Sequence, residues 1–224
     1  MANLVLAPAP VLSATSAGHP AWPHPVAVGR FLGTVGAAGA LGFMVLLHVF
    51  AGARIEPVTS TLSNAVFAPG VGWMFPAGVL SMALAGLGAV IILRVSSLRA
   101  GSLATLAVGV TAVGLLVVAL FPTDPVGTGS LSAQIHRYAA AVVMVAVPVA
   151  ALRVASALPL HTAGRRMLRA AAVMTLAVVL VTGVAIFLPG VFDPARGLIQ
   201  RFLLLSELVV LALLVYLPAR ATLR

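Results

Sequence analysis

Residues 197–217 read GLIQRFLLLSELVVLALLVYL, an apolar run that is interrupted by Gln200, Arg201, Ser206 and Glu207. A helix needs roughly 20 mostly apolar residues to cross the hydrocarbon core of a bilayer, so this run predicts a transmembrane helix. Five earlier segments have the same character. The sequence therefore predicts an all-α fold, a polytopic bundle of six transmembrane helices within residues 26–221, at about 28–50, 71–93, 101–121, 135–158, 167–188 and 197–217.

The composition of the whole chain agrees with a membrane protein. The 224 residues are 62% hydrophobic and 8% charged, whereas a soluble domain has about 25% charged residues. This excludes a soluble enzyme, a disordered protein and a nucleic-acid binder. The chain has no Cys, which excludes disulfides, thiol nucleophiles and thiolate metal sites.

The first 25 residues differ from the rest of the chain. They are rich in Ala and Pro, and the first basic residue is Arg30. A secretory signal would need a basic start and a longer apolar core. We therefore expect residues 1–25 to form a disordered cytoplasmic tail.

The arginines indicate the orientation of the bundle in the membrane. All 13 basic residues are Arg, and short loops rich in Arg stay in the cytoplasm. With six spans, both termini lie on one side, which carries nine arginines against four on the other. The sequence predicts a multi-pass protein of the cell membrane with both termini in the cytoplasm. The four on the outer side are Arg54, Arg137, Arg196 and Arg201.

Glu207 is the most unusual residue in the predicted spans. It lies ten residues into the last span, about 15 Å along a helix axis and near the middle of the membrane. A charge there costs about 2.5–3.5 kcal/mol on insertion scales, so the side chain should face the interior of the bundle. It is a candidate ligand-binding or proton-relay carboxyl, and a buried hydrogen-bond hub is the structural alternative. Gln200, seven positions earlier, shares almost the same helix face.

Three further polar residues are expected at the outer ends of the spans. Asp124 and His136 flank a short loop and could form an acid–base pair, so we take them as candidate catalytic residues. The structural alternative is that Asp124 holds a turn and that His136 packs at the interface. His48 near the outer end of the first span is a candidate ligand contact or an interhelical donor. Metal binding by these residues is the weaker interpretation, and we expect no metal.

Small residues recur on the first two spans. Gly33, Gly36, Gly39 and Gly42 are spaced by three, and Gly78, Ser81 and Ala85 follow on the second span. Small side chains allow helices to approach closely in lipid. We expect them to serve packing and not chemistry.

Three stretches resemble the signatures of a known family. They are Leu62-Ser63-Asn64 with Pro69-Gly70-Val71-Gly72-Trp73, then Phe121-Pro122-Thr123-Asp124-Pro125 with Ile135-His136, and finally Pro189-Gly190 with Gly197-Leu198-Ile199-Gln200-Arg201. Together they resemble the bacterial and archaeal multi-pass membrane proteins of domain of unknown function 998. The resemblance implies that the three signatures lie on one face of the membrane, and it implies no established activity. Asn64 and Gln200 stand where the family pattern usually has acids.

Three functions are compatible with these features. The first is a membrane-embedded enzyme or lipid-binding protein whose polar pocket faces outward, with Arg137 and Arg201 on an anionic head group and Glu207 at its floor. The second is a proton-coupled transporter, and the third is a non-catalytic scaffold or partner subunit. We expect no cofactor and no nucleic acid; the expected partners are the lipid bilayer and a lipid ligand.

Overall fold

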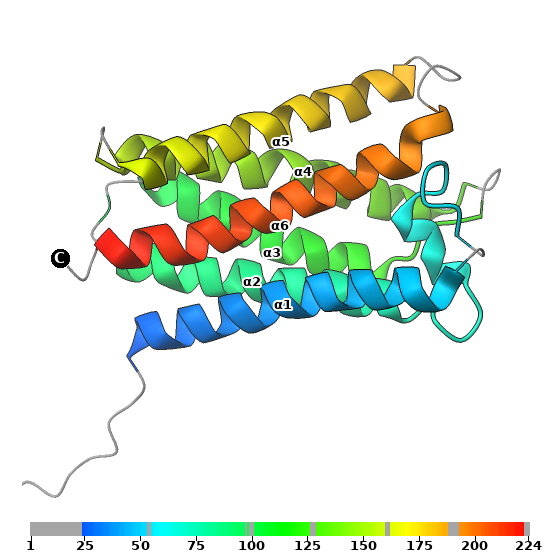
Figure 1. The fold of residues 1–224 in the computed structure, drawn as a ribbon, viewed down its shortest axis with the longest axis horizontal. Helices are drawn as coiled ribbons and strands as arrows, with labels where there is room; N and C mark the ends of the chain where they lie inside the picture. Colours follow the sequence, from blue (N-terminus) through cyan, green and yellow to red (C-terminus); the bar gives the residue numbers. More distant parts are fainter. Residues whose placement is uncertain are drawn as a thin grey trace, which may run out of the picture.

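The structure is a computed structural model that describes residues 24–52, 55–96, 98, 101–125, 129–159, 162–187 and 193–221. Six long helices form one bundle (Figure 1). Each is long and apolar enough to cross a membrane, which confirms the predicted all-α fold with six spans. The described part holds no strand. The helices are α1 (Pro25–Ala51), α2 (Met74–Val95), α3 (Gly101–Leu120), α4 (Leu131–Ala157), α5 (Ala163–Phe187) and α6 (Arg196–Ala221), with the short 3₁₀ helices η2 (Leu62–Phe67) and η3 (Asp193–Ala195).

Two helix starts differ from the prediction because a cap or a turn decides them. Helix α4 begins at Leu131 and not near residue 135, because the Ser130 hydroxyl accepts a hydrogen bond from the Ala133 N–H at 3.2 Å and caps the helix. Helix α2 begins three residues later than expected. Pro69 and Gly70 form a turn before it, and Gly70 has a φ of 79°, which suits the third position of a type II turn.

The two ends of the bundle differ in what they contain. Helix α1 begins and α6 ends at the same end of the molecule (Figure 1), and we call that part the terminal half. The distal half holds the connection between α1 and α2 with η2, the end of α3, and the starts of α4 and α6. Residues 1–23, which make up most of the predicted tail, lie outside the described residues.

Close contact between α1 and α2 closes the terminal half. A Cβ atom added at Gly88 would lie 2.5 Å from both the Gly29 carbonyl oxygen and the Gly33 nitrogen, and one added at Gly36 would lie 2.4 Å from the Ala85 nitrogen. The two backbones therefore touch where the side chains are hydrogen atoms. Gly42 has open space around it, so the predicted run of glycines serves packing only in part.

Candidate functional site

The connection between α1 and α2 is fastened to the first turns of α6. The Leu198 N–H donates to the Val58 carbonyl at 3.0 Å, and the Leu62 N–H donates to Oε1 of Gln200. A helix cannot satisfy the N–H groups of its first turn internally, so the loop supplies the missing acceptor at Leu198. A Cβ at Gly197 would lie 2.4 Å from the Ser60 carbonyl oxygen, which explains why glycine stands there.

Arg201 completes this junction and connects it to α1. Its Nη1 donates to the carbonyls of Ser60 at 2.8 Å and Gly197 at 2.9 Å, and its Nε donates to Nε2 of His48 at 2.8 Å. His48 Nδ1 lies 2.6 Å from the Met44 carbonyl. Since a carbonyl only accepts, Nδ1 carries the proton and the neutral ring offers Nε2 to Arg201. His48 and Arg201, which the sequence predicted on the same outer side, are thus in direct contact, and Gln200 binds the same loop.

The remaining guanidinium nitrogen of Arg201, Nη2, is buried and has no hydrogen-bond partner among the described residues. Arg201 lines a small cavity of about 20 Å³, which has room for about one water molecule. Arg137 is exposed on α4 and does not line this cavity. The residues around it are Leu47, His48, Ala51, Gly52, Ile55, Pro57, Leu62 and Arg201. The binding of an anionic head group by Arg137 and Arg201 stays a prediction.

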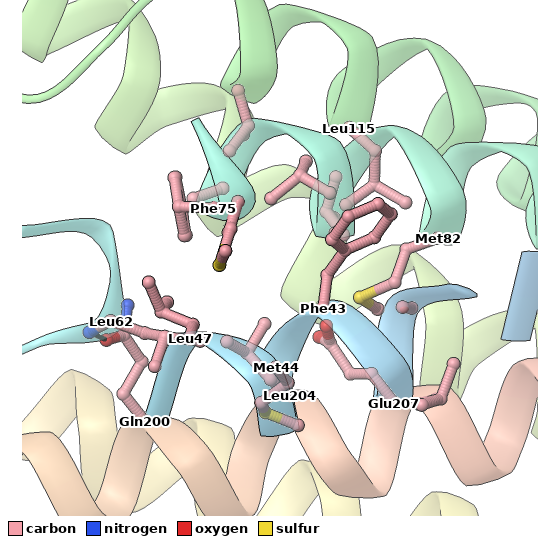
Figure 2. Close-up of a pocket in the computed structure, with 18 of the residues that line it drawn as sticks. Phe43, Met44, Leu47, Leu62, Phe75, Met82, Leu115, Gln200, Leu204 and Glu207 are labelled. Atoms are coloured by element: carbon pink, nitrogen blue, oxygen red, sulfur yellow. Dashed lines mark hydrogen bonds between the residues drawn. The ribbon is translucent and has the colours of Figure 1, made fainter. Parts of the chain in front are cut away.

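A larger cavity, which we call the main cavity, occupies the distal half beside this junction (Figure 2). Its volume is about 70 Å³. One water-sized group needs about 10–15 Å³ on this scale, so the cavity accommodates a chain of several heavy atoms. Helix α5 contributes none of the lining residues. They are Ala40, Phe43, Met44, Leu47, Leu62, Met74, Phe75, Gly78, Val79, Met82, Leu115, Val118, His136, Ala140, Val143, Met144, Gln200, Leu204, Glu207 and Leu208.

Glu207 contributes a carboxyl group to a cavity lining that is otherwise largely apolar. Its side chain is 0% exposed, and both carboxyl oxygens lack a hydrogen-bond partner among the described residues. Figure 2 shows its carboxyl on the side of the cavity near Phe43 and Met82, with Gln200 and Leu62 at the other end. The sequence correctly predicted that Glu207 faces the interior of the bundle. An ionised carboxylate in such a place costs several kcal/mol unless a partner reaches it.

His136 lines the main cavity, whereas Asp124 does not. The His136 ring is buried, and its Nδ1 lies 2.8 Å from the Phe121 carbonyl and 3.2 Å from the Val118 carbonyl. The Asp124 carboxylate accepts hydrogen bonds from the N–H and the hydroxyl of Ser130. The acid–base pairing of these two residues stays a prediction, and the structure gives each side chain other partners.

The sequence did not point to the methionines of the cavity. Four of the seven Met residues of the chain line it. Met side chains are flexible and polarizable, and they adapt to irregular apolar shapes. A weak signal was present, because Met44 and Met74 lie in the outer parts of their predicted spans, but Met is as common in ordinary cores. The four are Met44, Met74, Met82 and Met144.

Comparison with known proteins gives one match. The model of a family described as "Protein of unknown function (DUF998)" matches residues 5–217. No curated protein matches the chain, and no solved structure matches it. The match covers all three stretches that carried the resemblance.

Proposed function

Since the chain belongs to the DUF998 family of proteins of unknown function, whose description names no activity, we propose a function from the geometry of the main cavity. The protein binds an amphipathic molecule, a lipid or a compound of similar character, inside the distal half of the bundle. The observation that carries this proposal is a mostly apolar cavity, built by five helices and η2, that contains one fully buried carboxyl. Ligand pockets commonly combine apolar walls with few polar groups that fix orientation.

The arginine bias supports a cavity that faces outward. In the orientation that this bias predicts, with both termini in the cytoplasm, the distal half lies toward the outer leaflet. Leu47 and Leu62 line both cavities, so they separate the apolar interior from the polar junction around Arg201. An amphipathic ligand would place its apolar part past these two side chains.

Proton-coupled transport fits these observations less well. A transporter needs polar groups that continue toward the other side of the membrane. The described lining ends near Glu207 and Met82, and beyond it Gly36 and Gly88 bring α1 and α2 into backbone contact. These features support a cup closed at the terminal half.

Cavity filling tests the proposal. Ala140 lines the cavity, so Ala140→Phe should occupy part of its volume. Gly109→Phe is the matched control, because a Cβ atom added at Gly109 has no described atom within 4 Å. Both variants and the wild type would be purified in detergent, and the amphipathic molecules retained by each would be quantified by mass spectrometry.

We expect the wild type and Gly109→Phe to retain a common molecule that Ala140→Phe has lost. The same retained molecules in Ala140→Phe, at equal amounts and with a folded protein, would contradict binding in this cavity.

A further inference from the structure

We infer that the ligand of the main cavity carries a protonated amine and that the Glu207 carboxylate is its counter-ion. The inference rests on the proposed function and names its ligand class. Both carboxyl oxygens of Glu207 are buried without a partner among the described residues, and the lining contains no Arg. A protonated amine that enters the cavity would therefore meet a carboxyl group that no cation among the described residues pairs with, and it would supply the partner that an ionised carboxylate needs there.

Arg201 does not take this role, although it lies on the same helix. Six residues separate it from Glu207, a rise of about 9 Å and a rotation of about 120° away from the same face. Its Nε and Nη1 already donate to His48, Ser60 and Gly197. It lines the small cavity and not the main one.

The His136 ring and the aromatic rings of the lining also favour a ligand that donates hydrogen bonds and carries a positive charge. His136 Nδ1 is bound to backbone carbonyls, so the lone pair of the neutral ring is on Nε2 and can accept. The aromatic faces of Phe43 and Phe75 attract cations.

An ammonium group suits such a lining better than the alternatives. It supplies three donors and a full positive charge, which compensates the buried carboxylate. A hydroxyl supplies one donor and no charge, and a carboxylate ligand would be repelled by Glu207. The apolar walls then hold the alkyl part of the same molecule.

Three probes of equal chain length separate these ligand classes. Octylamine, octanol and octanoate would be added at neutral pH to the full-length protein in phosphatidylcholine nanodiscs. Dissociation constants would be measured by calorimetry, and thermal unfolding would be followed alongside. The variants are Glu207→Gln, which keeps the side-chain shape, and Ala140→Phe. Glu56→Gln is the control for loss of an acid, because Glu56 is exposed and lies outside the main cavity.

We expect octylamine to bind the wild type and Glu56→Gln at least about tenfold more tightly than octanol does, a difference of about 1.4 kcal/mol. Glu207→Gln should lose that preference while it still unfolds cooperatively. Equal affinity for octylamine and octanol in the wild type, or an unchanged preference in Glu207→Gln, would overturn the inference.

The two proposals can fail separately. If octanol and octylamine bind equally and Ala140→Phe abolishes both, the cavity binds amphipathic molecules without selecting amines. If Ala140→Phe changes no affinity, the proposed function itself is wrong.

Discussion

The Nε atom of Arg201 donates a hydrogen bond to Nε2 of His48 over 2.8 Å, across a sequence separation of 153 residues. This bond joins the end of α1 to the start of α6 beside the main cavity. Because the Met44 carbonyl fixes the proton on Nδ1, the imidazole acts here as an acceptor. The pair therefore has a structural role that can be measured separately from ligand binding.

His48→Ala should destabilise the protein. The change leaves Arg201 Nε without its acceptor, and hydrogen bonds to charged groups contribute about 1.5–3 kcal/mol. The free energy of unfolding would be measured in detergent by chemical denaturation. A double-mutant cycle with Arg201→Ala should give a coupling energy of about 0.5–3 kcal/mol. Additivity of the two single changes would show that the bond contributes nothing, and the exposed Arg137→Ala serves as the arginine control.

Glu207→Met should stabilise the protein in the absence of ligand. The change replaces two buried oxygens, which have no partner among the described residues, by an apolar side chain of similar length. A buried polar group without a partner costs about 1–3 kcal/mol. Thermal unfolding of the purified variant would show a raised midpoint. A lowered midpoint would mean that the carboxyl has a stabilising partner in the folded protein.

Gly88→Val should destabilise the packing of α1 against α2. Its Cβ would lie 2.5 Å from backbone atoms of Gly29 and Gly33, so the helices would have to separate. Overpacking typically costs about 1–3 kcal/mol. Gly109→Val is the control, since open space surrounds that position. Equal unfolding midpoints for the two variants would refute the close contact.

Asp124→Ala should weaken the start of α4 without changing ligand affinity. The carboxylate accepts from Ser130, which is itself the cap of the helix, and the loss of a cap costs about 0.5–2 kcal/mol. Asp124→Asn keeps one acceptor oxygen and should lose less. Unfolding measurements together with octylamine titrations would check both parts. A large loss of affinity in the stable Asn variant would favour the direct role that the sequence suggested.

The fold could be predicted from sequence because length and hydropathy set each span independently. The inward orientation of the Glu207 side chain could be predicted from its depth in the span alone, since an acid in the middle of the membrane must face protein. The partners of Asp124 and His136 could not be predicted because they depend on where α4 begins, and the predicted start was about four residues too late. With α4 starting at Ser130 and Leu131, His136 lies in the second turn and inside the bundle, and Asp124 meets Ser130. The serine at position 130 was the signal for that cap.

The junction at Arg201 could not be predicted in detail. The sequence placed His48, Gln200 and Arg201 on one side of the membrane, but their partners are the carbonyl of Ser60, the N–H of Leu62 and a ring on another helix. Such contacts depend on how a loop folds back, and hydropathy carries no information on this. The spacing of the glycines also did not show which of them lie in a contact. Gly29, Gly33 and Gly36 recur about once per helical turn and lie against other helices, whereas Gly42 does not.

The junction between the α1–α2 connection and α6 also has a consequence for biosynthesis. Its bonds from Gln200 and Arg201 to the loop span 138 and 141 residues, so they cannot form until the chain has been made as far as Arg201. Helices α1 to α5 must enter the membrane while the loop still lacks its α6 partner. Helix α6 thus completes the cavity wall after α1 to α5, and ribosome-stalled chains that end before residue 196 should expose their distal loop to protease.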